Sequence, residues 1–91
     1  MALYAVTIRY VDDVELVNAT RPLHREYLSG LLDQGKIQQS GPYVDGGAAL
    51  LVYEVADRAE LDGILANDPY AQKGCLADTE VHEWNVVFSR V

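Results

Sequence analysis

Hydrophobic and polar positions alternate along the chain in patterns that predict six elements. Residues 2–10 are rich in β-branched and aromatic types, which is typical of a strand. Apolar residues at three- and four-residue spacing then predict a helix from about Thr20 to Gln34. The face of this helix that we expect to be buried consists of Leu23, Tyr27, Leu28, Leu31 and Leu32.

Capping residues suggest where this helix begins and ends. Thr20 is a suitable N-cap, and Pro22 is tolerated in a first helical turn, where its missing N–H would have no partner. Gly35 follows as a C-terminal stop. On this interpretation His24 lies close to the start of the helix.

The middle of the chain predicts two strands joined by a tight turn. Residues 36–43 form the first, and Pro42 within it favours a bulge or an edge position. Asp45-Gly46-Gly47 is a hairpin signal. Residues 48–56 are apolar at nearly every position, which indicates a central strand covered on both faces.

The last third predicts a helix, a further helical turn and a strand. Asp57 and Glu60 match a capping box for the helix. Asp68-Pro69 begins another turn that ends near Gly74. Residues 79–90 are expected to form a long final strand.

The element order βαββαβ predicts a ferredoxin-like α+β fold for a single domain over residues 1–91. We expect an antiparallel sheet in the strand order 4-1-3-2, with both helices on one face. The first, third and last strands are predicted to carry apolar residues on both faces. An apolar patch on the uncovered face would favour a homodimer that packs sheet against sheet.

The charge balance excludes some classes of partner. Fourteen acidic against seven basic residues give a net charge of −7, which argues against nucleic acid and anionic membrane. Cys75 is the single cysteine, so no internal disulfide is expected. We see no secretory signal and no apolar stretch of membrane-spanning length, and therefore expect a cytoplasmic protein.

His24 and Asp68 are the candidate catalytic residues. The predicted topology brings the start of the first helix and the end of the second to one edge of the sheet, together with Arg21 and Ser40. A carboxylate beside an imidazole fixes its tautomer and supports acid/base catalysis. Two simpler interpretations stay open: a structural histidine, and an aspartate that only caps a helix. A non-catalytic domain that binds a small molecule also stays open.

Other kinds of site are not expected. His24 and His82 lack the supporting carboxylate spacing of a metal site. No glycine-rich dinucleotide turn is present, so we predict no cofactor. Cys75 has no basic neighbour closer than Lys73 and is not expected to act as a nucleophile.

An ordered set of motifs resembles the YCII-related (YciI-like) family over essentially the whole chain. The set ends with a tryptophan, Trp84, on the predicted last strand. In the family a proline often precedes this tryptophan, whereas this sequence reads His-Glu-Trp-Asn. The other motifs are RPxHxxYL at residues 21–28, the helix-ending Gly35, Gly41-Pro42 with glycines in the next turn, and Asp68-Pro69-Tyr70.

This resemblance implies a dimeric α+β barrel with an active site built on a His24–Asp68 pair. It also implies that Arg21 and Ser40 bind substrate, with Tyr70 of the Asp68-Pro69-Tyr70 motif as a further binding residue. One branch of the family is similar to dehydrochlorinases that act on hydroxylated aromatic rings. The expected reaction is therefore an isomerisation or an elimination on a small anionic or aromatic molecule.

Overall fold

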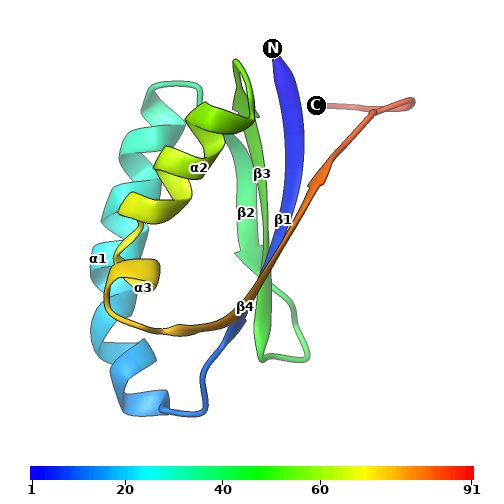
Figure 1. Cartoon of the computed structure of the whole chain (residues 1–91). Helices are drawn as coiled ribbons and strands as arrows, with labels where there is room; N and C mark the ends of the chain where they lie inside the picture. Colours follow the sequence, from blue (N-terminus) through cyan, green and yellow to red (C-terminus); the bar gives the residue numbers. More distant parts are fainter.

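The computed structural model describes residues 1–91, and its architecture is ferredoxin-like α+β (Figure 1). The strands form one antiparallel sheet in the order β2-β3-β1-β4, as predicted, and the helices lie on one side of it. In chain order the elements are β1 (Ala2–Tyr10), α1 (Val14–Asp33), β2 (Ile37–Pro42), β3 (Ala48–Val55), α2 (Arg58–Asn67), α3 (Pro69–Gln72) and β4 (Leu76–Glu83).

The core lies between the helices and the two central strands. Val6 on β1 is directly opposite Leu51 on β3 and Val81 on β4, and Tyr4 is opposite Tyr53. Val6, Leu51 and Tyr53 are almost completely buried. These cross-strand partners share the helix-covered face, because side chains directly opposite in a sheet point the same way.

The helix α1 begins at Val14, so the prediction that it starts at Thr20 is wrong. The side chain of Asp13 is the N-cap and accepts a hydrogen bond from the backbone N–H of Leu16. Thr20 is buried inside the helix, where its hydroxyl donates to the carbonyl of Leu16 at 2.9 Å. Pro22 is therefore an interior proline, although an interior proline costs a helix about 3 kcal/mol. We infer that packing of α1 on the sheet offsets this cost.

The buried face of α1 also differs from the prediction. Leu23 and Leu32 were expected inside, but they are 47% and 56% exposed. The residues that α1 buries are Val17, Thr20, His24 and Leu31. The buried side of the helix thus includes the imidazole of His24, at a position where a purely apolar face would have a residue such as leucine.

Other local predictions are confirmed. Gly35 adopts φ +75° just after α1, and the N–H of Lys36 donates to the carbonyl of Leu31, which closes the helix end. Asp57 caps α2 by accepting the N–H of Glu60 at 2.9 Å. The strand β2, which contains Pro42, lies at an edge of the sheet.

The last strand is shorter than predicted and starts earlier. Residues 79–90 were expected in it, but β4 ends at Glu83. Trp84 donates its backbone N–H to the carbonyl of Leu3, and the segment after it runs on past the strand (Figure 1). The exposed apolar residues of this segment are Trp84, Val87, Phe88 and Val91.

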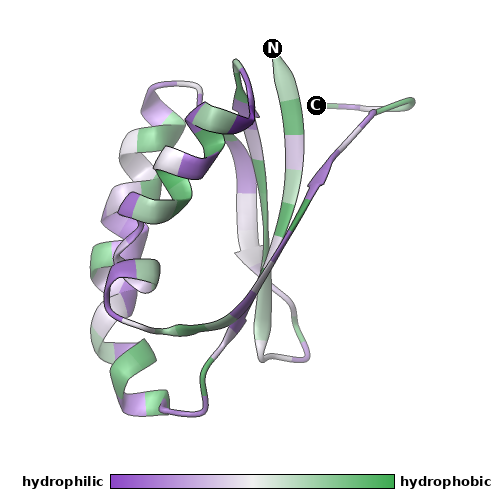
Figure 2. Ribbon diagram, in the orientation of Figure 1, coloured by the Kyte–Doolittle hydropathy of each residue, from purple (hydrophilic) through white to green (hydrophobic).

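The open face of the sheet is apolar only at its centre. Ala5 lies opposite Val52 of β3 and His82 of β4. The side chain of Arg9 bridges Asp78 and Glu80, so this face of β4 is charged, contrary to the prediction of an apolar strand. Figure 2 shows the contrast between the largely green β1 and the purple end of β4. None of the helices has both the length and the hydropathy needed to cross a bilayer.

Replacing the observed N-cap of α1 should destabilise the protein. We expect Asp13→Ala to lower the free energy of unfolding by about 1 kcal/mol, because the N–H of Leu16 loses its partner. Asp12→Ala is the matched control, since Asp12 is exposed and its side chain accepts no hydrogen bond. Urea denaturation of both variants measures the difference. Equal costs for the two variants would show that Asp13 is not the cap.

Candidate active site

A buried hydrogen bond joins His24 on α1 to Asp68 at the junction of α2 and α3. The Nδ1 atom of His24 lies 2.8 Å from Oδ1 and 3.0 Å from Oδ2 of Asp68. The two side chains are only 9% and 7% exposed. The predicted meeting of the two residues thus occurs, although His24 lies in the middle of α1 rather than at its start.

Asp68 is also the N-cap of α3. Its Oδ1 atom accepts the backbone N–H of Tyr70 at 2.9 Å, and Pro69 occupies the first helical position, where no N–H is required. The cap and the contact with His24 therefore share one oxygen. Because the cap fixes the carboxylate, it also fixes the position of the imidazole.

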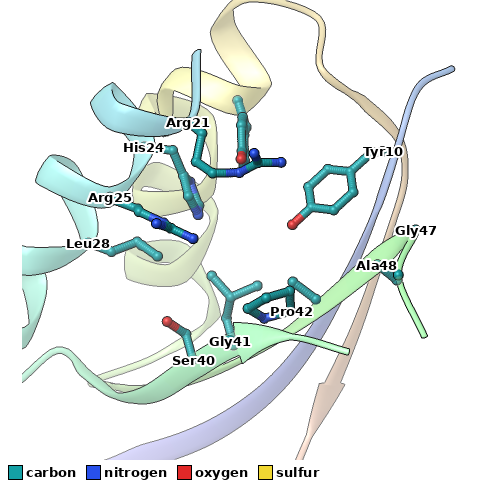
Figure 3. A pocket seen from close by; sticks show the side chains of 14 residues that line it. Tyr10, Arg21, His24, Arg25, Leu28, Ser40, Gly41, Pro42, Gly47 and Ala48 are labelled. Carbon is teal, nitrogen blue, oxygen red and sulfur yellow. The ribbon is translucent and has the colours of Figure 1, made fainter. Parts of the chain in front are cut away.

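This arrangement selects one tautomer of His24. A carboxylate accepts hydrogen bonds, so Nδ1 carries the proton and donates it to Asp68. The Nε2 atom then holds the lone pair. It has no hydrogen-bond partner within the protein, and His24 lines a cavity (Figure 3). A histidine with this arrangement can accept a proton from a molecule in the cavity.

Two tyrosines support the imidazole. The buried ring of Tyr70 stacks on His24, with the ring centroids 4.0 Å apart and the planes at 20°. The ring of Tyr10 meets Tyr70 edge-on at 5.5 Å. Burial and then the neighbouring Tyr70 raise the pKa of Tyr10, and the charges of Arg21 and Arg25 partly oppose this shift.

The cavity has a volume of about 520 Å³, which suits a small molecule. It lies between α1 and the ends of β2 and β3, and Figure 3 shows Arg21, His24 and Arg25 reaching into it from α1. Gly46 and Gly47 form part of the wall, with φ of +85° and +81°. These angles favour glycine, so this wall is made of backbone.

Apart from His24, the charged side chains that line the cavity are both arginines. Arg21 and Arg25 line it, and no aspartate or glutamate does, although the chain carries a net charge of −7. Arg21 donates to the side-chain oxygen of Asn18 at 2.7 Å, whereas Arg25 forms no ion pair within the protein. The local field therefore favours an anion.

The structure brings most of the predicted site residues together. Arg21, His24, Ser40 and Tyr70 line the cavity, and Asp68 lies directly behind His24. Ser40 comes from β2 and is exposed. The N-terminus of α1, which the predicted helix start placed beside Arg21, lies at Val14 and cannot supply N–H groups there.

Sequence reasoning missed two polar side chains of the lining, Tyr10 and Arg25. Arg25 follows Arg21 by four residues, which places both on one face of a helix, and this spacing could have indicated it. Tyr10 is the last residue of β1. It lines the cavity because the folded sheet brings it there, and no local sequence pattern indicates this.

Two further residues lie outside this cavity. Cys75 is completely buried, and its sulfur lies 4.0 Å from the carbonyl oxygen of Leu16. His82 is exposed on β4 and pairs with Glu80 at 2.7 Å. No three His, Cys, Asp or Glu side chains are grouped closely enough to hold a metal ion.

The chain belongs to the YCII-related family, because the model of the YCII-related domain matches residues 2–85. No protein among the curated ones matches the sequence significantly.

Solved structures with the same fold include 5-chloro-2-hydroxyhydroquinone dehydrochlorinase (TftG) from Burkholderia phenoliruptrix AC1100, in complex with 2,5-dihydroxybenzoquinone. It is 24% identical, with a TM-score of 0.81 over 91% of this chain and 93% of that one. An antibiotic biosynthesis monooxygenase is 18% identical, with a TM-score of 0.66 over 96% and 99% of the two chains. A NIPSNAP domain protein from Burkholderia xenovorans is 17% identical, with a TM-score of 0.61 over 96% and 95%. At these identities the likeness establishes the fold.

Removing the carboxylate of Asp68 should cost more stability than removing an ordinary cap. Asp68→Ala leaves both the N–H of Tyr70 and the buried Nδ1 of His24 without a partner. We expect a loss of about 2–4 kcal/mol, the sum of a cap and a buried hydrogen bond. Asp57→Ala, which removes only the exposed cap of α2, should cost about 1 kcal/mol. Chemical denaturation compares the two, and similar losses would contradict the double role.

Proposed function

We propose that this protein is a cofactor-independent enzyme that performs general acid/base chemistry on a small anionic molecule. The observation that carries this proposal is the Nε2 atom of His24. It has no partner within the protein, its ring is held by Asp68, and its cavity is otherwise charged only by Arg21 and Arg25. A base, a carboxylate that orients it and cationic groups that stabilise developing negative charge are parts that an isomerisation or an elimination uses.

In the proposed reaction, Nε2 of His24 accepts a proton from the substrate. Asp68 stabilises the resulting imidazolium through the existing Nδ1–H hydrogen bond. The electron pair left on the substrate moves towards a substrate oxygen. Arg21 and Arg25 stabilise the negative charge that develops there.

Two outcomes then conserve atoms and charge. In an isomerisation, the imidazolium returns its proton to a different atom of the substrate. In an elimination, a leaving group departs with the bonding electron pair, and the imidazolium then releases its proton to water; a chlorinated hydroxyarene would thus lose chloride and a proton. Tyr70 holds the imidazole ring in place by stacking, and it contributes with Ser40 to the surface that receives the substrate.

The likeness to the TftG dehydrochlorinase supports a trial of its named substrate. Chloride release from 5-chloro-2-hydroxyhydroquinone should be measured with wild-type protein and with His24→Gln. We expect the substitution to lower kcat by about 10²- to 10⁴-fold, because it removes the base. The control is His82→Gln, which changes an exposed histidine outside the cavity and should leave the rate unchanged. Arg25→Gln should lower kcat and kcat/KM, because it removes a group that stabilises the negative charge developing on the substrate oxygen.

The same experiment separates catalysis from binding alone. If His24→Gln retains the wild-type rate, the acid/base role is wrong. If a panel of chlorinated and unchlorinated phenols binds without turnover, the protein is a small-molecule-binding domain that uses the same cavity.

We also propose that two copies pair through the open face of the sheet. Support comes from the apolar centre of this face, which contains the half-buried Ala5 and Leu50, and from the exposed apolar residues Trp84 and Phe88 beyond β4. When a partner removes such apolar groups from water, the free energy falls and the pair is stabilised.

Sedimentation at micromolar concentration tests the pairing. Wild-type protein should sediment at twice the chain mass, and Leu50→Glu should sediment as a monomer, because it places a charge at the centre of the interface. Leu23→Glu is the control, since Leu23 is exposed on α1, on the other side of the sheet. A wild-type protein that stays monomeric when concentrated would exclude the dimer.

A further inference from the structure

Tyr10 presents an unpaired hydroxyl to the cavity that contains His24. It is the last residue of β1, it is half-buried, and it lines this cavity. The tyrosine hydroxyls that form hydrogen bonds within the protein are those of Tyr27 and Tyr43. The oxygen of Tyr10 is not sealed in the core either, because the one fully buried side-chain oxygen without a partner belongs to Tyr53. The hydroxyl of Tyr10 can therefore reach a molecule that enters the cavity.

The backbone and a neighbouring ring hold Tyr10 in this position. Its N–H donates to the carbonyl of Gly47, in the turn that forms part of the cavity wall, at 3.2 Å. Its ring meets that of Tyr70 edge-on at 5.5 Å, and Tyr70 in turn stacks on His24 at 4.0 Å. Two consecutive ring contacts thus link Tyr10 to the imidazole. A donor that is already positioned loses little entropy when a ligand binds.

The hydroxyl and the basic side chains approach the cavity from two sides. Figure 3 shows the ring of Tyr10 entering from the sheet, with its oxygen directed into the space that Arg21, His24 and Arg25 reach from α1. A ligand that fills this space therefore meets the base on the helix side and Tyr10 on the sheet side.

The phenol of Tyr10 is a neutral donor at physiological pH. Burial first, and then Tyr70, raise its pKa, and the charges of Arg21 and Arg25 oppose this shift without cancelling it. The hydroxyl therefore keeps its proton. A positive charge attracts any anion, whereas an O–H group requires an acceptor at a suitable distance and angle. Tyr10 can thus select for an oxygen where a positive charge selects for any anion.

We propose that Tyr10 is a substrate-contacting residue, and that its hydroxyl donates a hydrogen bond to the substrate oxygen on which negative charge develops. The site then selects molecules that carry this oxygen on the sheet side of the cavity, away from the proton that His24 accepts. It discriminates against anions of equal charge that lack a good acceptor. The effect of Tyr10 on a reaction rate rests on the function proposed above, whereas its contact with a bound oxyanion requires no turnover.

Two small anions separate recognition of oxygen from recognition of charge. Pentafluorophenolate has a single oxygen, and pentafluorothiophenolate has the same charge and ring with sulfur in its place, which is a weaker acceptor. Neither ring carries a hydrogen that His24 could remove, so binding is measured without turnover. In calorimetric titrations, Tyr10→Phe should weaken binding of the phenolate by roughly tenfold, as for a hydrogen bond to a charged group, and binding of the thiophenolate by clearly less.

The matched control is Tyr4→Phe. Tyr4 lies on the same strand and does not line the cavity, so this change should leave both affinities unaltered. Tyr10→Phe keeps the ring that meets Tyr70, and we therefore expect both variants to fold and to melt close to the wild-type temperature.

A second measurement concerns the proposed reaction. Tyr10→Phe should lower kcat by about 10²- to 10³-fold, as when one donor to a developing oxyanion is removed. Tyr4→Phe should leave kcat unchanged.

Each result has a distinct meaning. If Tyr10→Phe binds the phenolate as tightly as wild type does, or loses both anions equally, the proposal is wrong. Wild-type protein that binds neither anion would also overturn it. If Tyr10→Phe selectively loses the phenolate but no substrate is turned over, the contact is confirmed and the proposed enzymatic function fails. If His24→Gln abolishes turnover while Tyr10→Phe binds the phenolate normally, only the role of Tyr10 fails.

Discussion

The buried hydrogen bond between His24 and Asp68 is the interaction on which the site depends. It ties the middle of α1 to the start of α3, two segments that are 44 residues apart in sequence. Neither group would be stable in this environment alone, because an unpaired polar side chain in the core is costly. The bond therefore helps to hold the helical layer together, and it also leaves one nitrogen of the imidazole available to the cavity.

Local signals were sufficient for parts of the fold. Gly35 and Asp57 marked helix ends correctly because their effects act within a few residues of chain. The start of α1 was missed because Pro22 matches a first-turn proline in sequence, and only contacts with the sheet show that the helix continues past it. The charged face of β4 was missed for a related reason: strand register depends on pairing with β1.

The candidate site was predictable where topology alone decides proximity. The order of the elements brought His24, Asp68, Arg21 and Ser40 to one end of the sheet, and the structure places them there. Tyr10 could not be found in this way, because its sequence context is that of an ordinary strand. Its place in the cavity follows from the position of the last residue of β1 in the folded sheet.

The backbone wall formed by Gly46 and Gly47 has a consequence for how this protein can diverge. Any side chain at these two positions would meet backbone strain, even though there is open space around them. Evolution therefore has few viable substitutions on this side of the cavity. Changes in ligand preference among relatives that keep this turn should accumulate on the opposite side, at the α1 positions that hold Arg21, Arg25 and Leu28.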